Sequence, residues 1–291
     1  MTIGKKLYLL VGITTLLIFV ILTTYLSLRI NPLITSNYAD AMDENLLNVE
    51  AMVNLEVISQ KEKTFVAGNL AMNYLDKTGS IEESENDFVY VNNVQLPKWS
   101  INQNTIQNNF EIVDAIKDYG VETATIFQKF NNGYIRVSTN VMTDQGARAV
   151  GTHIGWDSPV VQAIEKGERF QGRAWVVDRW YITDYQPIYI NGEIKGILYV
   201  GNTEINYSAL SNYFATKNYL GSGYPYIVNS EGIVTAHPVY AKNGKEIDIS
   251  NEEFFKEMVQ KENGTVVYDW EGGEKTQFFK YVPEIDSYVT V

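Results

Sequence analysis

The stretch WVVDRWYITDYQP, from Trp175 to Pro187, combines large aromatic rings with charges in what has the pattern of a β-hairpin. Residues two apart in a strand share a face, so Tyr181, Thr183 and Tyr185 are expected on one face of a sheet. Asp184 is expected on the opposite face. Buried tyrosine hydroxyls need hydrogen-bond partners, so this strand is a candidate wall of a ligand pocket.

Charged side chains near this hairpin favour a ligand that carries a carboxylate. Arg173 and Trp175 share a face of the preceding strand, and Arg136 lies in the earlier stretch YIRVST. Arginine suits a carboxylate because its planar fork donates two parallel hydrogen bonds, whereas Asp184 could hold an ammonium group. An amino acid needs both poles, and a plain organic acid needs only the first. The predicted ligand-binding residues are Arg136, Arg173, Trp175, Tyr181, Asp184 and Tyr185.

Structural roles compete with these assignments. Arg136 and Arg173 could instead form salt bridges that fasten the sheet to a helix. Trp175 and Trp180 could pack in the core. The sequence leaves both roles open at these positions.

The rest of the sequence argues against catalysis, metal binding and nucleic-acid binding. The chain has two histidines, His153 and His237, and neither a G-x-S-x-G elbow nor an H-E-x-x-H motif. It has no cysteine, which excludes disulfides and thiolate metal sites. A net charge of -12 is unsuited to phosphate contacts. We therefore predict no catalytic residue, no metal, no cofactor, no nucleic-acid partner and no enzymatic activity.

The first thirty residues predict a membrane anchor. The segment Leu7–Leu28 has no charged residue and is long enough to cross a hydrocarbon core of about 30 Å. Lys5 and Lys6 precede it, which favours a cytoplasmic N-terminus over residues 1–6 and an extracytoplasmic remainder. A cleaved signal peptide is the alternative, but the apolar run is long and no small-residue cleavage motif closes it. We expect a single N-terminal span in the cell membrane.

Beyond the span, apolar residues recur at intervals of three and four, and this spacing predicts that the chain continues as a helix. They are Met42, Leu46, Val49, Val53 and Val57. The expected stalk helix covers residues 29–84 and ends in the polar stretch DKTGSIEESE. Such a helix must pack on the following domain, on a second copy of itself, or on both, and a homodimer through the stalk is predicted.

Two later segments share one order of elements, which indicates an internal duplication. Each opens with a hairpin, at Ala124–Thr139 and at Tyr224–Pro238, and continues with a short helix and a three-stranded meander. The expected units cover residues 85–204 and 221–291, and a connecting helix covers residues 205–220. Because the chain stops at Val291 within an expected last strand, we expect a fragment that ends before a second transmembrane helix.

The short helices carry start and stop signals. Ser158 is followed by Pro159 at the first helical position. Ser250 with Glu253 has the spacing of a capping box. Both helices are expected to stop at a glycine, Gly167 in the first and Gly264 in the second.

Several motifs resemble the Cache 3–Cache 2 fusion type of Cache-domain sensor regions, found in methyl-accepting chemotaxis proteins and sensor kinases. The first unit carries IFQKFNNGYIRVSTNV (Ile126–Val141), GARAVGTHI (Gly146–Ile154), SPVVQAIEKGERFQGRA (Ser158–Ala174), YITDYQPI (Tyr181–Ile188) and GEIKGILYVG (Gly192–Gly201). The second unit resembles the family more generally, through GYPYIVNSEGIVTAHP (Gly223–Pro238).

The resemblance implies an α+β fold, in which a transmembrane helix continues into a long stalk helix followed by two PAS-like antiparallel-sheet units in tandem. It implies a membrane-distal unit that takes up the ligand, followed by a membrane-proximal unit. It also favours Arg136 as a recurrent element of the family's first strand pair. The second unit has Phe278 and Lys280 where the first has Ile182 and Asp184, so binding is expected in the first.

The leading hypothesis is the extracytoplasmic sensor region of a transmembrane chemoreceptor. It would bind a small polar ligand, such as an amino acid or an organic acid, and pass the signal through the membrane helix. The alternatives are the sensor region of a histidine kinase or diguanylate cyclase, and a membrane-anchored module that binds another protein without a small ligand.

Overall fold

The structure, a computed structural model, describes residues 3–177, 179–239 and 247–291, which form two compact units. The six-stranded unit consists of Val53–Asn206, and the five-stranded unit consists of Met1–Met52 with Tyr207–Val291. Each unit has a main antiparallel sheet flanked by helices, and each is described by itself.

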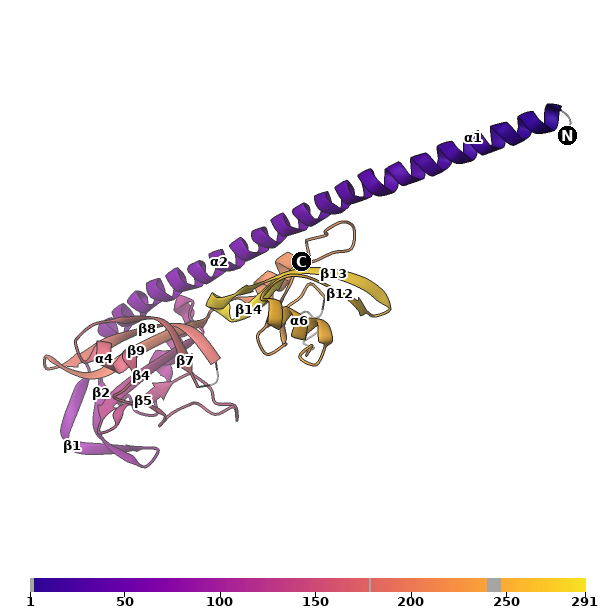
Figure 1. The fold of residues 1–291 in the computed structure, drawn as a ribbon. Coiled ribbons are helices and arrows are strands. Elements are labelled where there is room, and N and C mark those ends of the chain that lie inside the picture. The colour runs from indigo at the N-terminus through magenta and orange to yellow at the C-terminus, as the bar shows by residue number, and fades with distance from the viewer. Residues whose placement is uncertain (1–2, 178, 240–246) are drawn as a thin grey trace. The chain divides into compact units, whose positions relative to one another are not determined.

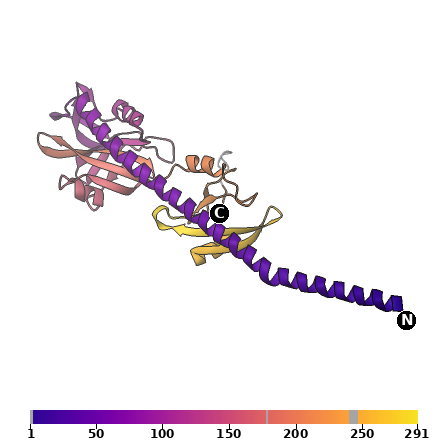
Figure 2. The ribbon, with the colours of Figure 1, turned by 90° about the horizontal axis from the view of Figure 1, so that it is seen from above.

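The chain begins with a helical segment drawn in indigo and purple in Figures 1 and 2. It comprises α1 (Ile3–Tyr25), a π-helical turn η1 (Leu26–Ile30) and α2 (Asn31–Thr78). The N-terminal part of this segment is apolar and long enough to cross a membrane. Four threonine hydroxyls in it donate to backbone carbonyls of the preceding turn, which satisfies them without water; they are Thr14, Thr15, Thr23 and Thr24.

The predicted stalk helix is present but shorter than expected. It ends at Thr78 instead of residue 84, since Gly79 takes a φ of 146° and Glu82 already belongs to a strand. The predicted apolar stripe is confirmed at its first four positions: Met42, Leu46, Val49 and Val53 are buried.

The six-stranded sheet has the order β6-β5-β4-β9-β8-β7. Its strands are β4 (Thr123–Phe130), β5 (Gly133–Thr139), β6 (His153–Ile154), β7 (Phe170–Val176), β8 (Arg179–Ile190) and β9 (Glu193–Thr203). Both hairpins expected here, β4–β5 and β7–β8, are present. The helix face of this sheet packs on Ala67, Ala71 and Leu75 of α2 and on α3 (Glu111–Ile116). The opposite face, which we call the aromatic face, packs on α4 (Pro159–Ile164).

A three-stranded sheet was not foreseen from the sequence. It consists of β1 (Glu82–Val91), β2 (Val94–Ile101) and β3 (Asn104–Thr105). The strand β1 begins with acidic residues and lacks apolar alternation, so its pattern resembles a loop. It pairs with β2, whose Trp99 is fully buried and donates its indole N–H to the Glu83 carboxylate at 2.8 Å.

The five-stranded sheet has the order β11-β10-β14-β13-β12, which matches β5-β4-β9-β8-β7 position by position. Its strands are β10 (Tyr226–Asn229), β11 (Val234–Ala236), β12 (Asn263–Trp270), β13 (Gly273–Val282) and β14 (Ser287–Thr290). It is accompanied by α5 (Tyr207–Phe214), within the expected connecting helix, and by α6 (Glu253–Lys261). The shared strand order indicates that the two units are copies of one PAS-like fold.

The helix signals were correct for α4 and wrong for α6. The Ser158 hydroxyl caps α4 by accepting from the N–H of Val160, as expected. The residue that precedes α6 is Glu252, without a side-chain cap, so Ser250 lies too early to cap it. Gly264 does not end α6 either, because the helix stops at Lys261 and Gly264 lies within β12.

Candidate functional site

The aromatic face of the six-stranded sheet holds a buried arginine. Arg136 in β5 is 6% exposed, and its guanidinium carbon lies 4.9 Å from the ring centroid of Phe127 in β4. One terminal N–H group donates to the Thr152 hydroxyl at 2.6 Å, whereas Nε has no hydrogen-bond partner. Across the described parts of the chain, no carboxylate pairs with this guanidinium. The positive charge is therefore buried without a counter-ion among the residues that the structure describes.

The backbone fixes this arginine in place. The N–H of Arg136 donates to the Thr152 carbonyl at 2.8 Å, and the N–H of Gly151 donates to the Arg136 carbonyl at 2.9 Å. The Thr152 hydroxyl donates to the Ala149 carbonyl, so its lone pairs remain to accept from the guanidinium. The loop before β6 thus accepts a hydrogen bond from one terminal nitrogen of the guanidinium and leaves Nε without a partner.

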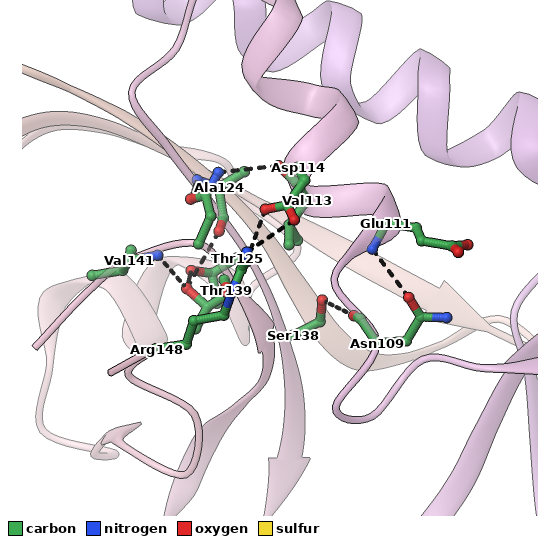
Figure 3. A network of polar contacts seen from close by, with 11 residues as sticks. Asn109, Glu111, Val113, Asp114, Ala124, Thr125, Ser138, Thr139, Val141 and Arg148 are labelled. Atoms are coloured by element: carbon green, nitrogen blue, oxygen red, sulfur yellow. Dashed lines mark hydrogen bonds and ion pairs between the residues drawn. The ribbon is translucent and has the colours of Figure 1, made fainter. Parts of the chain in front are cut away.

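A polar network holds the loop between β5 and β6 at Val141 and at Arg148 (Figure 3). Arg148 makes two hydrogen bonds to the Asp114 carboxylate of α3, at 2.8 and 2.9 Å, and a third to the Thr139 carbonyl. The Thr139 hydroxyl accepts from the N–H of Val141 and shares a hydrogen bond with the Thr125 hydroxyl. These contacts tie α3, β4, β5 and the loop together.

Tyrosines surround the arginine. The ring of Tyr185 in β8 lies 4.8 Å from that of Tyr199 in β9 and 6.4 Å from that of Phe127. The Tyr199 hydroxyl is hydrogen-bonded to Thr123, whereas no hydrogen bond joins the Tyr185 hydroxyl to another described residue. Burial raises the pKa of Tyr185 to about 12, although the nearby charge of Arg136 opposes this shift. Tyr185 is therefore a neutral hydroxyl donor at physiological pH.

Chemically, this arrangement suits an anion with two oxygens. A guanidinium with a free Nε and a neighbouring phenol are both hydrogen-bond donors. The surrounding rings exclude water and strengthen a charge-assisted hydrogen bond. Burial lowers the pKa of Arg136, but a guanidinium keeps its proton in proteins.

The structure brings three of the six predicted site residues together and places the other three elsewhere. Arg136, Tyr181 and Tyr185 lie on the aromatic face. Arg173 and Trp175 lie on the helix face of the β7–β8 hairpin, because each is paired across it with Ile182 or Trp180. Asp184 lies on that face too, as strand alternation predicts.

Arg173 and Trp175 form a partly exposed cluster at the end of that hairpin. Arg173 forms an ion pair with Glu204 at 2.5 Å and lies 4.2 Å from the ring centroid of Trp180. Trp175 meets Trp180 edge to face at 5.5 Å, and they are 58% and 43% exposed. Core packing of these tryptophans, one alternative from the sequence, is therefore wrong, and a salt bridge at Arg173 is present.

Asp184 fastens the sheet to α2. Its buried carboxylate accepts two hydrogen bonds from Arg169, one of them from Nε at 2.6 Å. Arg169 also donates to the Phe65 carbonyl at 3.0 Å and to Asn69 at 2.6 Å, both in α2. A β-carbon at Gly68 would collide with this carboxylate, so glycine is needed where helix and strand meet. Burial raises the pKa of Asp184, and Arg169 opposes that shift.

Sequence reasoning missed several members of the site. They are Phe127, Thr152, Phe170 and Tyr199 on the aromatic face, and Arg169 on the helix face. The alternation of β4 and β9 could have indicated Phe127 and Tyr199. Thr152 and Arg169 come from loops, which no periodicity predicts.

Neither histidine belongs to this site. His153 packs against Phe130 in the six-stranded unit, with ring centroids 5.5 Å apart. Among the described residues, no group of three or more His, Cys, Asp or Glu side chains is placed to hold a metal ion. His237 is buried in the five-stranded unit beside Tyr224 and Tyr226.

The buried imidazole of His237 predicts a pH dependence of stability. Burial lowers its pKa from 6.5 to about 4, so as pH falls the unfolded state binds the proton first. We expect the free energy of unfolding of the five-stranded unit to fall by about 2 kcal/mol between about pH 7.5 and about pH 5 on this account. Urea titrations of wild type and His237→Gln should show the steeper loss in wild type, and equal slopes would contradict the assignment.

Two sheets that share the order of five strands, each with flanking helices, follow a long apolar helix and define a tandem PAS-like sensory domain. The sequence model of the Cache 3/Cache 2 fusion domain matches residues 31–291, and the chain belongs to this family of sensory ligand-binding domains. The resemblance seen in the sequence motifs is thereby confirmed.

The solved structures to which the chain is similar include three ligand-binding domains, two of them from chemoreceptors. The ligand-binding domain of the Campylobacter jejuni chemoreceptor Tlp3 in complex with L-valine is 15% identical, with 90% of this chain and 94% of that chain covered and a TM-score of 0.44. The ligand-binding domain of Mlp24 with asparagine is 14% identical, with 90% and 94% covered and a TM-score of 0.42. That of the Pseudomonas fluorescens chemoreceptor CtaA with L-isoleucine is 12% identical, with 92% and 94% covered and a TM-score of 0.37. A search of the curated proteins found no match.

Proposed function

We propose that this chain is the extracytoplasmic sensor region of a membrane-bound chemoreceptor, and that its six-stranded unit binds the carboxylate of an amino acid or organic acid through Arg136. The observation that carries the proposal is the burial of this arginine without an acidic partner among the described residues. Membership of a sensory family and an N-terminal helix able to cross a membrane support the same assignment.

A buried, unpaired charge is costly for a fold. Removing a charged group from water costs several kcal/mol or more unless hydrogen bonds and an opposite charge compensate. The Thr152 hydroxyl compensates one N–H of Arg136, and Nε is left without a partner. A ligand carboxylate supplies both the missing charge and the missing acceptor, so its binding energy can exceed that of an exposed ion pair.

The remainder of the site limits what else the ligand carries. Tyr185 offers a hydroxyl, and the rings of Phe127 and Tyr199 offer apolar faces that also attract an ammonium group. Asp184, predicted to hold the ammonium, lies on the other face in an ion pair with Arg169. We therefore give the carboxylate the main part in recognition, with the amino group as a secondary determinant.

The test is a thermal-stability screen of the full chain in detergent against amino acids, organic acids and amines. A ligand at 100 times its dissociation constant should stabilise the folded state by about 2.7 kcal/mol. Active compounds should lose their effect when the carboxylate is converted to a methyl ester. If no carboxylate stabilises a well-folded chain, or the esters act equally well, the proposal fails and protein binding becomes the better hypothesis.

We also propose that α2 joins two copies of the chain. Within the six-stranded unit, one side of this helix exposes Leu55, Ile58, Val66 and Leu70, which are 43% to 64% exposed. The buried Ala67 and Ala71 lie on a different side of the helix. Leu55 and Ile58 are three residues apart and Val66 and Leu70 are four apart, with Glu62 between the two pairs. Exposed apolar pairs at these spacings on one helix face are typical of a helix–helix interface.

If this interface forms, a single charge placed within it should weaken the self-association of the chain. Val66→Glu should weaken self-association at least tenfold, because a carboxylate would be buried against apolar side chains. The matched control is Lys61→Glu, an exposed position outside the stripe, and it should leave association nearly unchanged. Sedimentation velocity of the full chain in detergent measures both. A monomeric wild type, or equal effects of the two variants, would rule out this interface.

A further inference from the structure

The five-stranded unit contains a cavity of about 670 Å³, within the usual size range of small-molecule pockets. One wall is formed by the start of α2, through Thr35, Tyr38, Ala39 and Met42. The facing wall is formed by strands of the sheet, through Tyr226 in β10, Tyr268 in β12 and Gln277 in β13. None of the residues assigned above to the carboxylate site contributes to this cavity.

The interior of this cavity is rich in aromatic rings. Phe254 and Tyr268 stack with their centroids 3.8 Å apart, and Trp270 meets Phe254 edge to face at 6.1 Å. The ring of His237 meets Tyr224 edge to face at 5.0 Å. Rings arranged at such distances provide flat surfaces on which another ring can stack.

A small number of polar groups lie among these rings. The Tyr226 hydroxyl donates to the Gln277 side-chain oxygen at 2.6 Å. The Gln277 amide N–H is directed at the Met258 sulfur at 3.1 Å, a weak acceptor that a better one can replace. The cavity therefore offers an amide donor to a ligand that carries one acceptor.

The charge of the lining indicates an uncharged ligand. Its acidic and basic side chains are Glu274 and Lys275, and both are exposed at the surface. The His237 imidazole is neutral near pH 7, because burial lowers its pKa to about 4. A buried carboxylate or ammonium would find no counter-ion among the interior side chains that line the cavity.

We propose that this cavity is a second ligand site, which takes an uncharged aromatic molecule with one hydrogen-bonding group, such as an indole or a phenol. The ring stacks among the aromatic side chains, and the polar group meets the amide of Gln277. Because Tyr38, Ala39 and Met42 form one wall, the ligand contacts α2 close to the apolar segment that precedes it.

The experiment uses 5-fluoroindole and the full chain in detergent micelles, with binding followed by fluorine NMR. Empty micelles give the baseline for partition of the probe. Ala39→Phe fills the cavity from the α2 wall, and Thr265→Phe fills it from an exposed position of β12. Ala51→Phe adds the same ring at an exposed position of α2 away from the cavity.

We expect wild type and Ala51→Phe to bind the probe equally, and each cavity-filling variant to bind at least tenfold more weakly. Arg136→Met should bind as wild type does, so failure of the carboxylate site would not affect this result. Equal binding by wild type and both folded cavity-filling variants would overturn the proposal. Binding of tetramethylammonium in preference to 5-fluoroindole would also overturn it, because the site would then be a cation cage.

Discussion

Replacing Arg136 with methionine should abolish stabilisation by a carboxylate ligand while leaving the ligand-free protein at least as stable as wild type. The ligand loses its counter-charge, and removing one partner of a buried charge pair costs about 2–5 kcal/mol, or roughly 30-fold or more in affinity. The ligand-free protein loses a buried guanidinium with a single side-chain partner, and methionine fills a similar volume. Replacing buried ionic groups by apolar ones of similar volume is often neutral or stabilising by about 1–4 kcal/mol.

Thermal melting with and without ligand measures both effects on the full chain. Lys195→Met is the control, because Lys195 pairs with Glu193 and Glu83 near the surface and lies outside the proposed site. It should cost about 1 kcal/mol or less and keep the ligand response. If Arg136→Met strongly destabilises the ligand-free protein, the arginine has a structural role and the proposed function loses its main support.

Replacing Asp184 with alanine should greatly lower the free energy of unfolding, unlike the replacement of Arg136. The substitution leaves the Arg169 guanidinium partly buried against α2 without its carboxylate, and such a loss costs about 3–5 kcal/mol. Urea denaturation followed by tryptophan fluorescence is a suitable measurement. Four of the chain's 5 tryptophans lie in the six-stranded unit: Trp99, Trp156, Trp175 and Trp180.

Two controls separate this effect from a general sensitivity to substitution. Asp114→Ala breaks the more exposed ion pair with Arg148 and should cost about 1 kcal/mol or less. The double variant Arg169→Met with Asp184→Leu removes both charges and should recover part of the loss. If Asp184→Asn keeps its stability and loses only the response to amino acids, Asp184 belongs to the ligand site, as the sequence had suggested.

Local patterns in the sequence were sufficient to identify most elements of the fold. Turn signals identified the hairpins β4–β5 and β10–β11, the pattern of residues 175–187 indicated β7–β8, and the repeated order of elements indicated two related units. The strand β1 was missed because its pairing with β2, rather than its own pattern, makes it a strand. The predictions that α6 is capped by Ser250 and ends at Gly264 were wrong, because capping and stop signals recur by chance in polar segments.

The candidate site was only partly predictable, because it depends on the order of strands. Alternation placed Tyr181 and Tyr185 on one face, but the sequence could not show that Arg136, on a strand separated from β8 by β4 and β9, lies close enough to affect the pKa of Tyr185. The ion pair of Asp184 depends on contacts between residues about a hundred positions apart, such as Arg169 with Phe65. Such contacts follow from tertiary packing and cannot be predicted from local sequence patterns.

Consecutive residues of β8 point to opposite faces of the six-stranded sheet, so a movement of this strand displaces side chains on both faces together. Tyr185 faces the arginine, while Asp184 is tied through Arg169 to residues 65–69 of α2. The peptide plane that joins them is rigid, so a tilt of the strand that repositions the ring must also displace the carboxylate. Coupling between the aromatic face and α2 therefore passes through one side-chain contact, that of Asp184 with Arg169, and its strength is set by how far one strand rotates about its own axis.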